Sequence, residues 1–257
     1  VGFSRAEENY PCPEGEYQNE SGQSQCKLSD PGFYVESEGS PNQVPCPPGT
    51  FSEESGATSM DSCIAVSPGE YSPGGVPSAI ECPPGTYQPD PGQESCIDAD
   101  PGHYAEGTGS VQQEECLPGT FQSDPSQYRC LEADKGHFVN THGSDSQFPC
   151  PAGTYGPDIG SDSAISCVTT PSGTYSHTGS PAPINCDAGS FNPLTGSTSE
   201  IDCLLSPPGN FSNSGSNQTT PCSSGTFQPD FGKPSCFDAE PGFFVPDTGS
   251  VYQLPCP

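Results

Sequence analysis

The sequence has little material for a hydrophobic core. Tryptophan is absent, methionine occurs once, and hydrophobic residues make up only 29% of the 257 residues. This shortage excludes a single large globular core. The chain has 15 cysteines instead, and such a composition is typical of proteins that fold in an oxidising compartment with disulfides as cross-links. We therefore expect a secreted, extracellular or cell-surface protein.

Basic residues are also scarce. The 33 acidic residues outnumber 5 basic ones, giving a formal net charge of -28. Such a surface repels phosphate, so nucleic acid and anionic membranes are not expected partners. No apolar run is long enough to span a membrane.

Catalytic motifs are missing as well. The sequence contains no G-x-S-x-G, no H-E-x-x-H and no phosphate-binding glycine loop followed by lysine, and it has four histidines. We expect no enzyme, and no cofactor is predicted.

What the chain does contain is a tandem repeat. An opening cysteine, usually within Cys-Pro, recurs at intervals of 34 or 36 residues, and a closing cysteine follows it within each repeat. This regularity predicts an array of small units and leaves no room for a separate domain. The predicted segments are the tail of a preceding repeat at 1–11, repeats at 12–45, 46–81, 82–115, 116–149, 150–185, 186–221 and 222–255, and the start of a further repeat at 256–257.

Each repeat carries two Gly-x-aromatic steps, usually preceded by proline. Proline fixes φ at the first central position of a type II turn, and glycine accepts the positive φ of the second. The aromatic residue then begins a short extended segment, and we expect its ring to pack against neighbouring disulfides and turns in a narrow core. These residues are Tyr17, Tyr34, Phe51, Tyr71, Tyr87, Tyr104, Phe121, Phe138, Tyr155, Tyr175, Phe191, Phe211, Phe227 and Phe244.

These turns and strands predict the fold class. We expect small disulfide-rich repeats in an elongated, solenoid-like rod of short β-hairpins and turns, with almost no helix. Stacked hairpins at the usual strand spacing would give a length on the order of 100 to 150 Å.

The lengths of the two halves of a repeat are coupled. Where the two cysteines are 14 residues apart, the gap to the next opening cysteine is 20, and where they are 17 apart the gap is 19. Independent loops would vary independently, so we expect the two halves to touch and each repeat to form one structural unit.

Counting leaves two disulfide pairings open, opening with closing cysteine or closing cysteine with the next opening one. We favour the first, which closes loops of about 15 to 18 residues, each bond contributing roughly 3 kcal/mol in the chain-entropy model. It leaves Cys256 over. The predicted disulfide cysteines are Cys12, Cys26, Cys46, Cys63, Cys82, Cys96, Cys116, Cys130, Cys150, Cys167, Cys186, Cys203, Cys222 and Cys236.

Segments such as CPPGTFSEESGATSMDSC and CPPGTYQPDPGQESC resemble the ephrin-receptor-like cysteine-rich repeat, and more distantly the single-disulfide opening module of tumour necrosis factor receptor repeats. The resemblance covers nearly all of the chain. Family members commonly carry a second cysteine before the next Pro-Gly step, where this chain has residues 97–100 or 64–67 instead. The resemblance implies a rod-like extracellular module that spaces, presents or binds other domains, and it supports the opening-to-closing pairing.

Acidic pairs and histidines are the candidate metal ligands. The pairs Asp98 with Asp100, Glu132 with Asp134 and Asp238 with Glu240 each share a face of an extended segment. Calcium needs six to eight ligands, so we interpret the pairs as a solvated edge. His103 and His137 lie one repeat apart, which does not favour a zinc site. No metal site is predicted.

Three asparagines lie in Asn-x-Ser/Thr sequons and are candidate glycan acceptors, namely Asn19, Asn210 and Asn217. Asn210 lies between Gly209 and Phe211, so its side chain is expected to point away from the buried ring. The sequence therefore favours Asn210 as the acceptor.

Two functions fit these observations. The first is a structural segment of an extracellular fibre, filament or cell-surface stalk, whose partners are copies of itself or further repeats end to end. The alternative is the ligand-binding ectodomain of a receptor, in which one repeat usually departs from the pattern. Because the seven repeats are nearly equivalent, the structural function is favoured.

Overall fold

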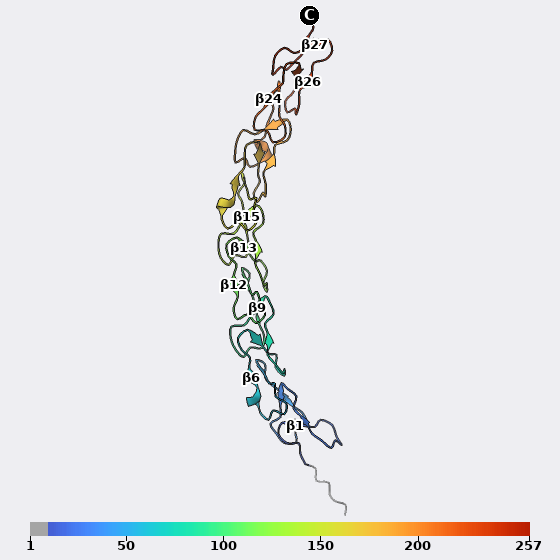
Figure 1. Cartoon of the computed structure of the whole chain (residues 1–257), viewed down its shortest axis with the longest axis vertical. Coiled ribbons are helices and arrows are strands. Elements are labelled where there is room, and N and C mark those ends of the chain that lie inside the picture. Colours follow the sequence, from blue (N-terminus) through green and yellow to red (C-terminus); the bar gives the residue numbers. More distant parts are fainter. Residues whose placement is uncertain (1–9) are drawn as a thin grey trace, which may run out of the picture. The chain divides into compact units, whose positions relative to one another are not determined.

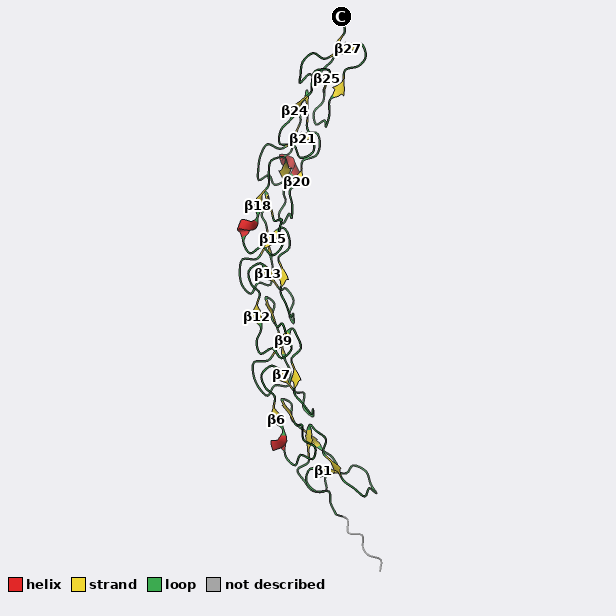
Figure 2. Ribbon diagram, in the orientation of Figure 1, coloured by secondary structure: helices red, strands yellow, loops and turns green. Residues whose placement is uncertain are grey.

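The computed structural model describes residues 10–257, so most of the predicted tail at 1–11 lies outside the described residues. The described part consists of two-residue strands and turns (Figure 1). The strands pair in sequence order, β1 with β2 through to β27 with β28, and each pair is an antiparallel hairpin. Helix in this part is limited to three short 3-10 turns, red in Figure 2. The predicted fold class, disulfide-rich repeats of short β-hairpins with almost no helix, is confirmed.

The chain divides into two compact units, Val1–Cys116 with Gln122–Cys130 and Leu117–Phe121 with Leu131–Pro257. The strands of unit 1 are β1 (Glu16–Tyr17), β2 (Lys27–Leu28), β3 (Phe33–Tyr34), β4 (Val44–Pro45), β5 (Thr50–Phe51), β6 (Ile64–Ala65), β7 (Glu70–Tyr71), β8 (Ile80–Glu81), β9 (Thr86–Tyr87), β10 (Ile97–Asp98), β11 (His103–Tyr104) and β12 (Glu114–Glu115). Its 3-10 turn is η1 (Met60–Ser62).

Unit 2 has the same pattern of hairpins. Its strands are β13 (Thr120–Phe121), β14 (Leu131–Glu132), β15 (His137–Phe138), β16 (Phe148–Pro149), β17 (Thr154–Tyr155), β18 (Val168–Thr169), β19 (Thr174–Tyr175), β20 (Ile184–Asn185), β21 (Ser190–Phe191), β22 (Leu204–Leu205), β23 (Asn210–Phe211), β24 (Thr220–Pro221), β25 (Thr226–Phe227), β26 (Phe237–Asp238), β27 (Phe243–Phe244) and β28 (Leu254–Pro255). Its 3-10 turns are η2 (Ala164–Ser166) and η3 (Glu200–Asp202).

A type II turn opens each hairpin, as proline directly before glycine predicts. At β5 the N–H of Thr50 donates to the carbonyl of Pro47 at 3.1 Å, and Gly49 between them has φ +83°. The Thr50 hydroxyl donates to the same carbonyl at 2.7 Å. Threonine after the turn glycine therefore closes the turn a second time, which explains its recurrence at this position.

The aromatic rings were expected to lie in the core, and this expectation is wrong. They are only half-buried, and Phe244 is exposed. The fully buried residues flank the strands instead. Cys82 and Ala99 are 0% exposed, and Gln88, directly after the ring of Tyr87, is 3% exposed. Successive residues of a strand point to opposite faces, so the ring and the residue after it cannot both face inward. The residues buried where neighbouring main chains approach are cysteine, alanine, serine, threonine and valine, together with folded-back amides such as Gln88.

In two hairpins the ring packs against an aromatic residue opposite it on the second strand. Phe138 lies opposite Phe148 with ring centroids 5.9 Å apart, and Phe227 lies opposite Phe237 at 6.0 Å. Such cross-strand pairs stabilise a hairpin by about 0.2 to 1 kcal/mol each.

Candidate stacking interface

The disulfides join the opening cysteine of each repeat to its closing cysteine, with Cα–Cα distances of 5.7 to 5.8 Å. The opening cysteines are buried and the closing ones half-buried. The bonds are Cys12–Cys26, Cys46–Cys63, Cys82–Cys96, Cys116–Cys130, Cys150–Cys167, Cys186–Cys203 and Cys222–Cys236. Cys256 is exposed and unpaired within the described chain.

The shorter disulfide loops are closed by a glutamine, which is buried in every one of them except Cys12–Cys26, where Gln18 is half-buried. In Cys82–Cys96 the Gln88 side-chain amide donates to the carbonyl of Ser95 at 2.8 Å, and its oxygen accepts the N–H of Asp90 at 3.2 Å. Gln122 and Gln228 make the equivalent bonds in their loops. Each glutamine thus joins the two limbs of a loop whose cysteines are 14 residues apart.

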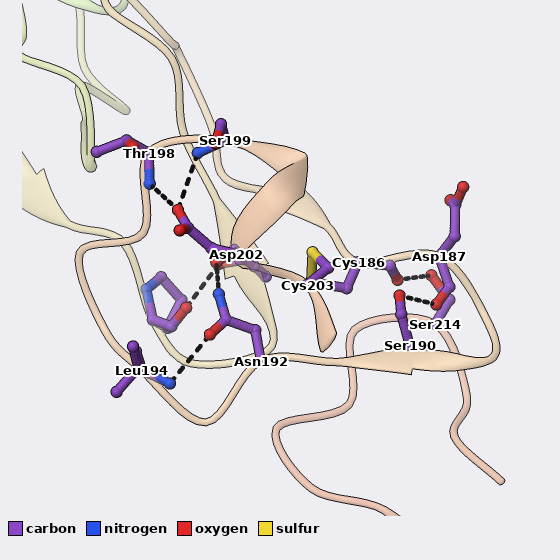
Figure 3. Close-up of a disulfide and its surroundings, with 12 residues drawn as sticks. Cys186, Asp187, Ser190, Asn192, Leu194, Thr198, Ser199, Asp202, Cys203 and Ser214 are labelled. Atoms are coloured by element: carbon purple, nitrogen blue, oxygen red, sulfur yellow. Dashed lines mark hydrogen bonds between the residues drawn. A yellow bond between two sulfur atoms is a disulfide. The ribbon is translucent and has the colours of Figure 1, made fainter. Parts of the chain in front are cut away.

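The longer loops contain a 3-10 turn directly before the closing cysteine. In Cys186–Cys203 the carboxylate of Asp202 accepts the N–H groups of Thr198 at 2.8 Å and Ser199 at 3.2 Å (Figure 3). Asn192 takes the place of the glutamine, and its side-chain amide donates to the carbonyl of Thr174 at 3.1 Å. The three extra residues of these loops therefore form a capped turn rather than a free bulge.

A second amide bridge holds the other half of the shorter-loop repeats, and sequence reasoning missed it. Gln147 accepts the N–H of Asp134 at 2.7 Å and donates to its carboxylate at 2.6 Å. Gln113 bridges Asp100 in the same way. A glutamine 13 residues after an acidic residue was the available signal.

These bridges account for part of the acidic pairs. Asp100 and Asp134 each close a loop through a glutamine side chain. Glu240 closes its loop in a similar way, because its backbone N–H donates to the side-chain oxygen of Gln253 at 2.8 Å. Within residues 10–257 no three His, Cys, Asp or Glu side chains lie together as a metal site would require. His103 and His137 are half-buried, and the Nδ1 atom of each ring lies near a backbone carbonyl of its own turn.

Successive hairpins are joined by main-chain hydrogen bonds. The N–H of each turn glycine donates to a backbone carbonyl of the following hairpin, that of the residue directly after its aromatic ring. Gly136 donates in this way to Gly156 at 2.9 Å, and Gly153 donates to Ser176 at 2.8 Å. Most loops have a glycine in the middle, the mid-loop glycine, whose N–H donates back to the residue that begins the preceding hairpin, as from Gly179 to Cys150 at 2.8 Å. In the β13–β14 loop Ser126, with φ +59°, takes this position and donates to Ala99 at 2.8 Å. A third bond runs from Gly156 to Ser180 at 3.0 Å.

The same bonds occur within a repeat and across its boundary. Gly85 donates to Ala105 inside repeat 82–115, and Gly102 donates across the boundary to Gln122 at 2.7 Å. The hairpin is therefore the unit of stacking. The repeat boundaries themselves stay a prediction.

The turn glycines also meet the hairpin after next. A Cβ built on Gly119 would lie 2.5 Å from the carbonyl oxygen of Gly160, closer than any side chain tolerates. Gly119 has φ +88° as well. Positive φ and close main-chain approach together require glycine there.

Two equivalent side chains break the polar pattern of the loops. Ile165 in η2 is 93% exposed and Ile201 in η3 is 89% exposed. Both occupy the second position before the closing cysteine, in neighbouring repeats of unit 2. Each lies on a turn anchored by a disulfide.

The chain is similar to a known family over part of its length. A family model described as tyrosine-protein kinase ephrin type A/B receptor-like matches residues 69–116. The match runs from the turn glycine of β7 to Cys116 and so includes the Cys82–Cys96 disulfide. It supports cysteine-rich repeats of this kind and an extracellular setting. No curated protein matches the chain.

A search for membrane-spanning helices gives none. No helix among residues 10–257 is long and apolar enough to cross a bilayer.

Proposed function

We propose that the chain is a structural segment of an extracellular fibre, filament or cell-surface stalk, with no catalytic activity, whose length is set by the number of stacked hairpins. The observation that carries the proposal is the interface itself. From Gly15 to Gly225, every turn glycine donates to the next hairpin at 2.7 to 2.9 Å. Main-chain bonds of this kind do not depend on side-chain identity, so hairpins can be added without redesigning the contact.

Disulfides stabilise each unit of this segment without a large core. Each disulfide closes one hairpin loop next to the main-chain groups that join hairpins. Cys150, for example, is bonded to Cys167, and its carbonyl accepts the N–H of Gly179 in the following hairpin. A disulfide of this loop length contributes about 3 kcal/mol in the chain-entropy model. A fibre outside the cell benefits because disulfides form and persist in the oxidising extracellular environment.

End-to-end partners would use the same groups. A further hairpin, from the same or another chain, would accept a hydrogen bond from a turn glycine, as successive hairpins of this chain do between Gly209 and Gln228. A head-to-tail contact that does not close into a ring generates a filament.

A receptor ectodomain is the second candidate, and the exposed isoleucines favour it. Apolar side chains on rigid turns bind a partner with little loss of conformational entropy. Ile165 and Ile201 would be the contact residues of such a site.

Electron microscopy of negatively stained native material decides between them. The structural function predicts long fibres at high dilution and low calcium. Separate short particles that bind a soluble protein with defined stoichiometry, and lose it in the Ile165→Ser/Ile201→Ser double variant, would refute the fibre and support the receptor.

A further inference from the structure

We infer that N-linked glycans are attached to Asn19 and Asn217 and that Asn210 stays bare. The inference rests on the extracellular setting of the proposed function, and it reverses the order that the sequence favours. A glycan needs an asparagine nitrogen with open space around it and a hydroxyl residue two positions later. The three sequons differ in both respects.

The sequon at Asn210 is built into a hairpin. Asn210 is half-buried in β23, opposite Pro221. Its side-chain nitrogen donates to the carbonyl of Pro208 at 3.2 Å, and its oxygen faces the hydroxyl of Thr219 at 3.5 Å. Both ends of the carboxamide are thus engaged within the hairpin, and a sugar on this nitrogen would have to fit beside Pro208 and Thr219.

The hydroxyl residue of the same sequon is inaccessible. Ser212 is 1% exposed, and its hydroxyl bonds to that of Ser206. Ser206 is itself 0% exposed. The folded hairpin thus encloses the hydroxyl residue of the Asn210 sequon and leaves its asparagine half-buried.

Asn217 has the opposite surroundings. It is exposed in the loop between β23 and β24, and Thr219 of its sequon is half-buried rather than enclosed. Its described side-chain contact runs from the amide nitrogen to the hydroxyl of Ser172 at 3.4 Å, near the outer limit for a hydrogen bond. One amide hydrogen can hold that contact while the other is replaced by a sugar.

Asn19 is exposed as well, in unit 1, and so is Ser21 of its sequon. Its described contact uses the side-chain oxygen, which accepts a bond from the Lys27 ammonium at 3.0 Å. The nitrogen that would carry a glycan is not engaged by that contact.

The modification is a group transfer from an activated sugar donor whose leaving group is a lipid-linked phosphate or pyrophosphate. A bond forms between the side-chain nitrogen and the anomeric carbon of the oligosaccharide. The bond from that carbon to the phosphate oxygen breaks, and the proton lost by nitrogen balances the charge of the released phosphate. The glycan on Asn217 would begin beside Ser172, two hairpins earlier. The stacking groups of this loop stay covered, since Gly215 donates to the carbonyl of Cys186 and Ser216 accepts from Asn192.

Peptide mass spectrometry of the protein from its native source tests the inference, after an amidase that releases N-glycans and converts the modified asparagine to aspartate. Conversion is expected at Asn19 and Asn217 and not at Asn210. Conversion at Asn210, or an unmodified Asn19 or Asn217, overturns it.

Variants expressed in the same cells give a second measurement. Asn217→Gln should remove one glycan and increase gel mobility by one step, whereas Asn210→Gln should not change it. Asn213→Gln is the matched control, because Asn213 is exposed in the same loop and lies in no sequon. Secreted fibres without glycans at Asn19 and Asn217 would refute the glycan inference and leave the fibre proposal standing. Separate particles with glycans at the predicted sites would refute the fibre alone.

Discussion

Gly119 contacts the main chain of Gly160. Alanine substitutions at these two positions, made one at a time, distinguish the cost of backbone strain from the cost of a steric collision. Both have positive φ, +88° and +67°. A Cβ on Gly119 would lie 2.5 Å from the Gly160 carbonyl oxygen, whereas a Cβ on Gly160 would lie 3.7 Å from its nearest neighbour, the Glu132 carboxylate. Gly160→Ala therefore adds strain alone, and Gly119→Ala adds strain and a collision.

The expected magnitudes differ accordingly. An alanine held at positive φ costs about 1 to 2 kcal/mol. In Gly119→Ala the neighbouring main chain must also retreat, which breaks the bonds from Gly119 to Val139 at 2.8 Å and from Gly160 to Ala133 at 2.7 Å. Each bond contributes roughly 1 kcal/mol. We expect local destabilisation of about 1 to 2 kcal/mol for Gly160→Ala, from backbone strain alone. For Gly119→Ala we expect about 3 to 4 kcal/mol, from the same strain and the two lost hydrogen bonds.

Native-state hydrogen exchange with intact disulfides is the appropriate assay, because an array of stacked units opens locally and does not unfold in one step. The amides of Gly136, Val139 and Cys150 report the hairpin that contacts Gly119. Their exchange should accelerate about 150- to 900-fold in Gly119→Ala and about 5- to 30-fold in Gly160→Ala, following the free energies above. Equal acceleration in the two variants would show that the close approach does not contribute to stability.

Three further outcomes follow from the loops. Peptide maps made without reduction should link Cys82 to Cys96 and Cys116 to Cys130, and a Cys96–Cys116 link would contradict the structure. Gln147→Ala removes both bonds to Asp134 and should destabilise its loop by about 1 to 2 kcal/mol in hydrogen exchange; Gln147→Glu should be worse at neutral pH, because it places a second carboxylate against Asp134. Asp202→Ala should accelerate exchange of Thr198 and Ser199 about 10-fold by the loss of one such bond each; Asp202→Asn keeps an acceptor oxygen and should change it little.

The turns could be predicted from the sequence because their chemistry is local. Proline, glycine and a hydroxyl residue at fixed offsets define the type II turn at Gly49, and its φ of +83° agrees. The position of the rings could not be predicted in the same way. Whether Tyr87 or Gln88 faces inward depends on how near the next main chain lies, and that distance is set by hydrogen bonds such as Gln88 to Ser110 that no side-chain pattern encodes.

The amide bridges were missed for a related reason. A surface glutamine carries no periodic signal, and its role at Gln147 is visible only once Asp134, 13 residues earlier, is known to lie across the hairpin. The same holds for the sequons. Asn210 was expected to have room for a glycan, yet its side-chain oxygen meets the hydroxyl of Thr219, nine residues later and directly before β24, which the local pattern does not include.

The coupled loop lengths are explained by the placement of the stacking groups. The insertion of three residues falls between the mid-loop glycine and the closing cysteine, as between Gly196 and Cys203. The deletion of one residue falls between the residue after the ring and the next mid-loop glycine, as between Ser176 and Gly179. Both changes lie between the N–H and C=O groups that join hairpins, and Gly179 still donates to Cys150 at 2.8 Å. Loops therefore vary in length and side chains while the interface stays constant, which is the property that a spacer built from many hairpins requires.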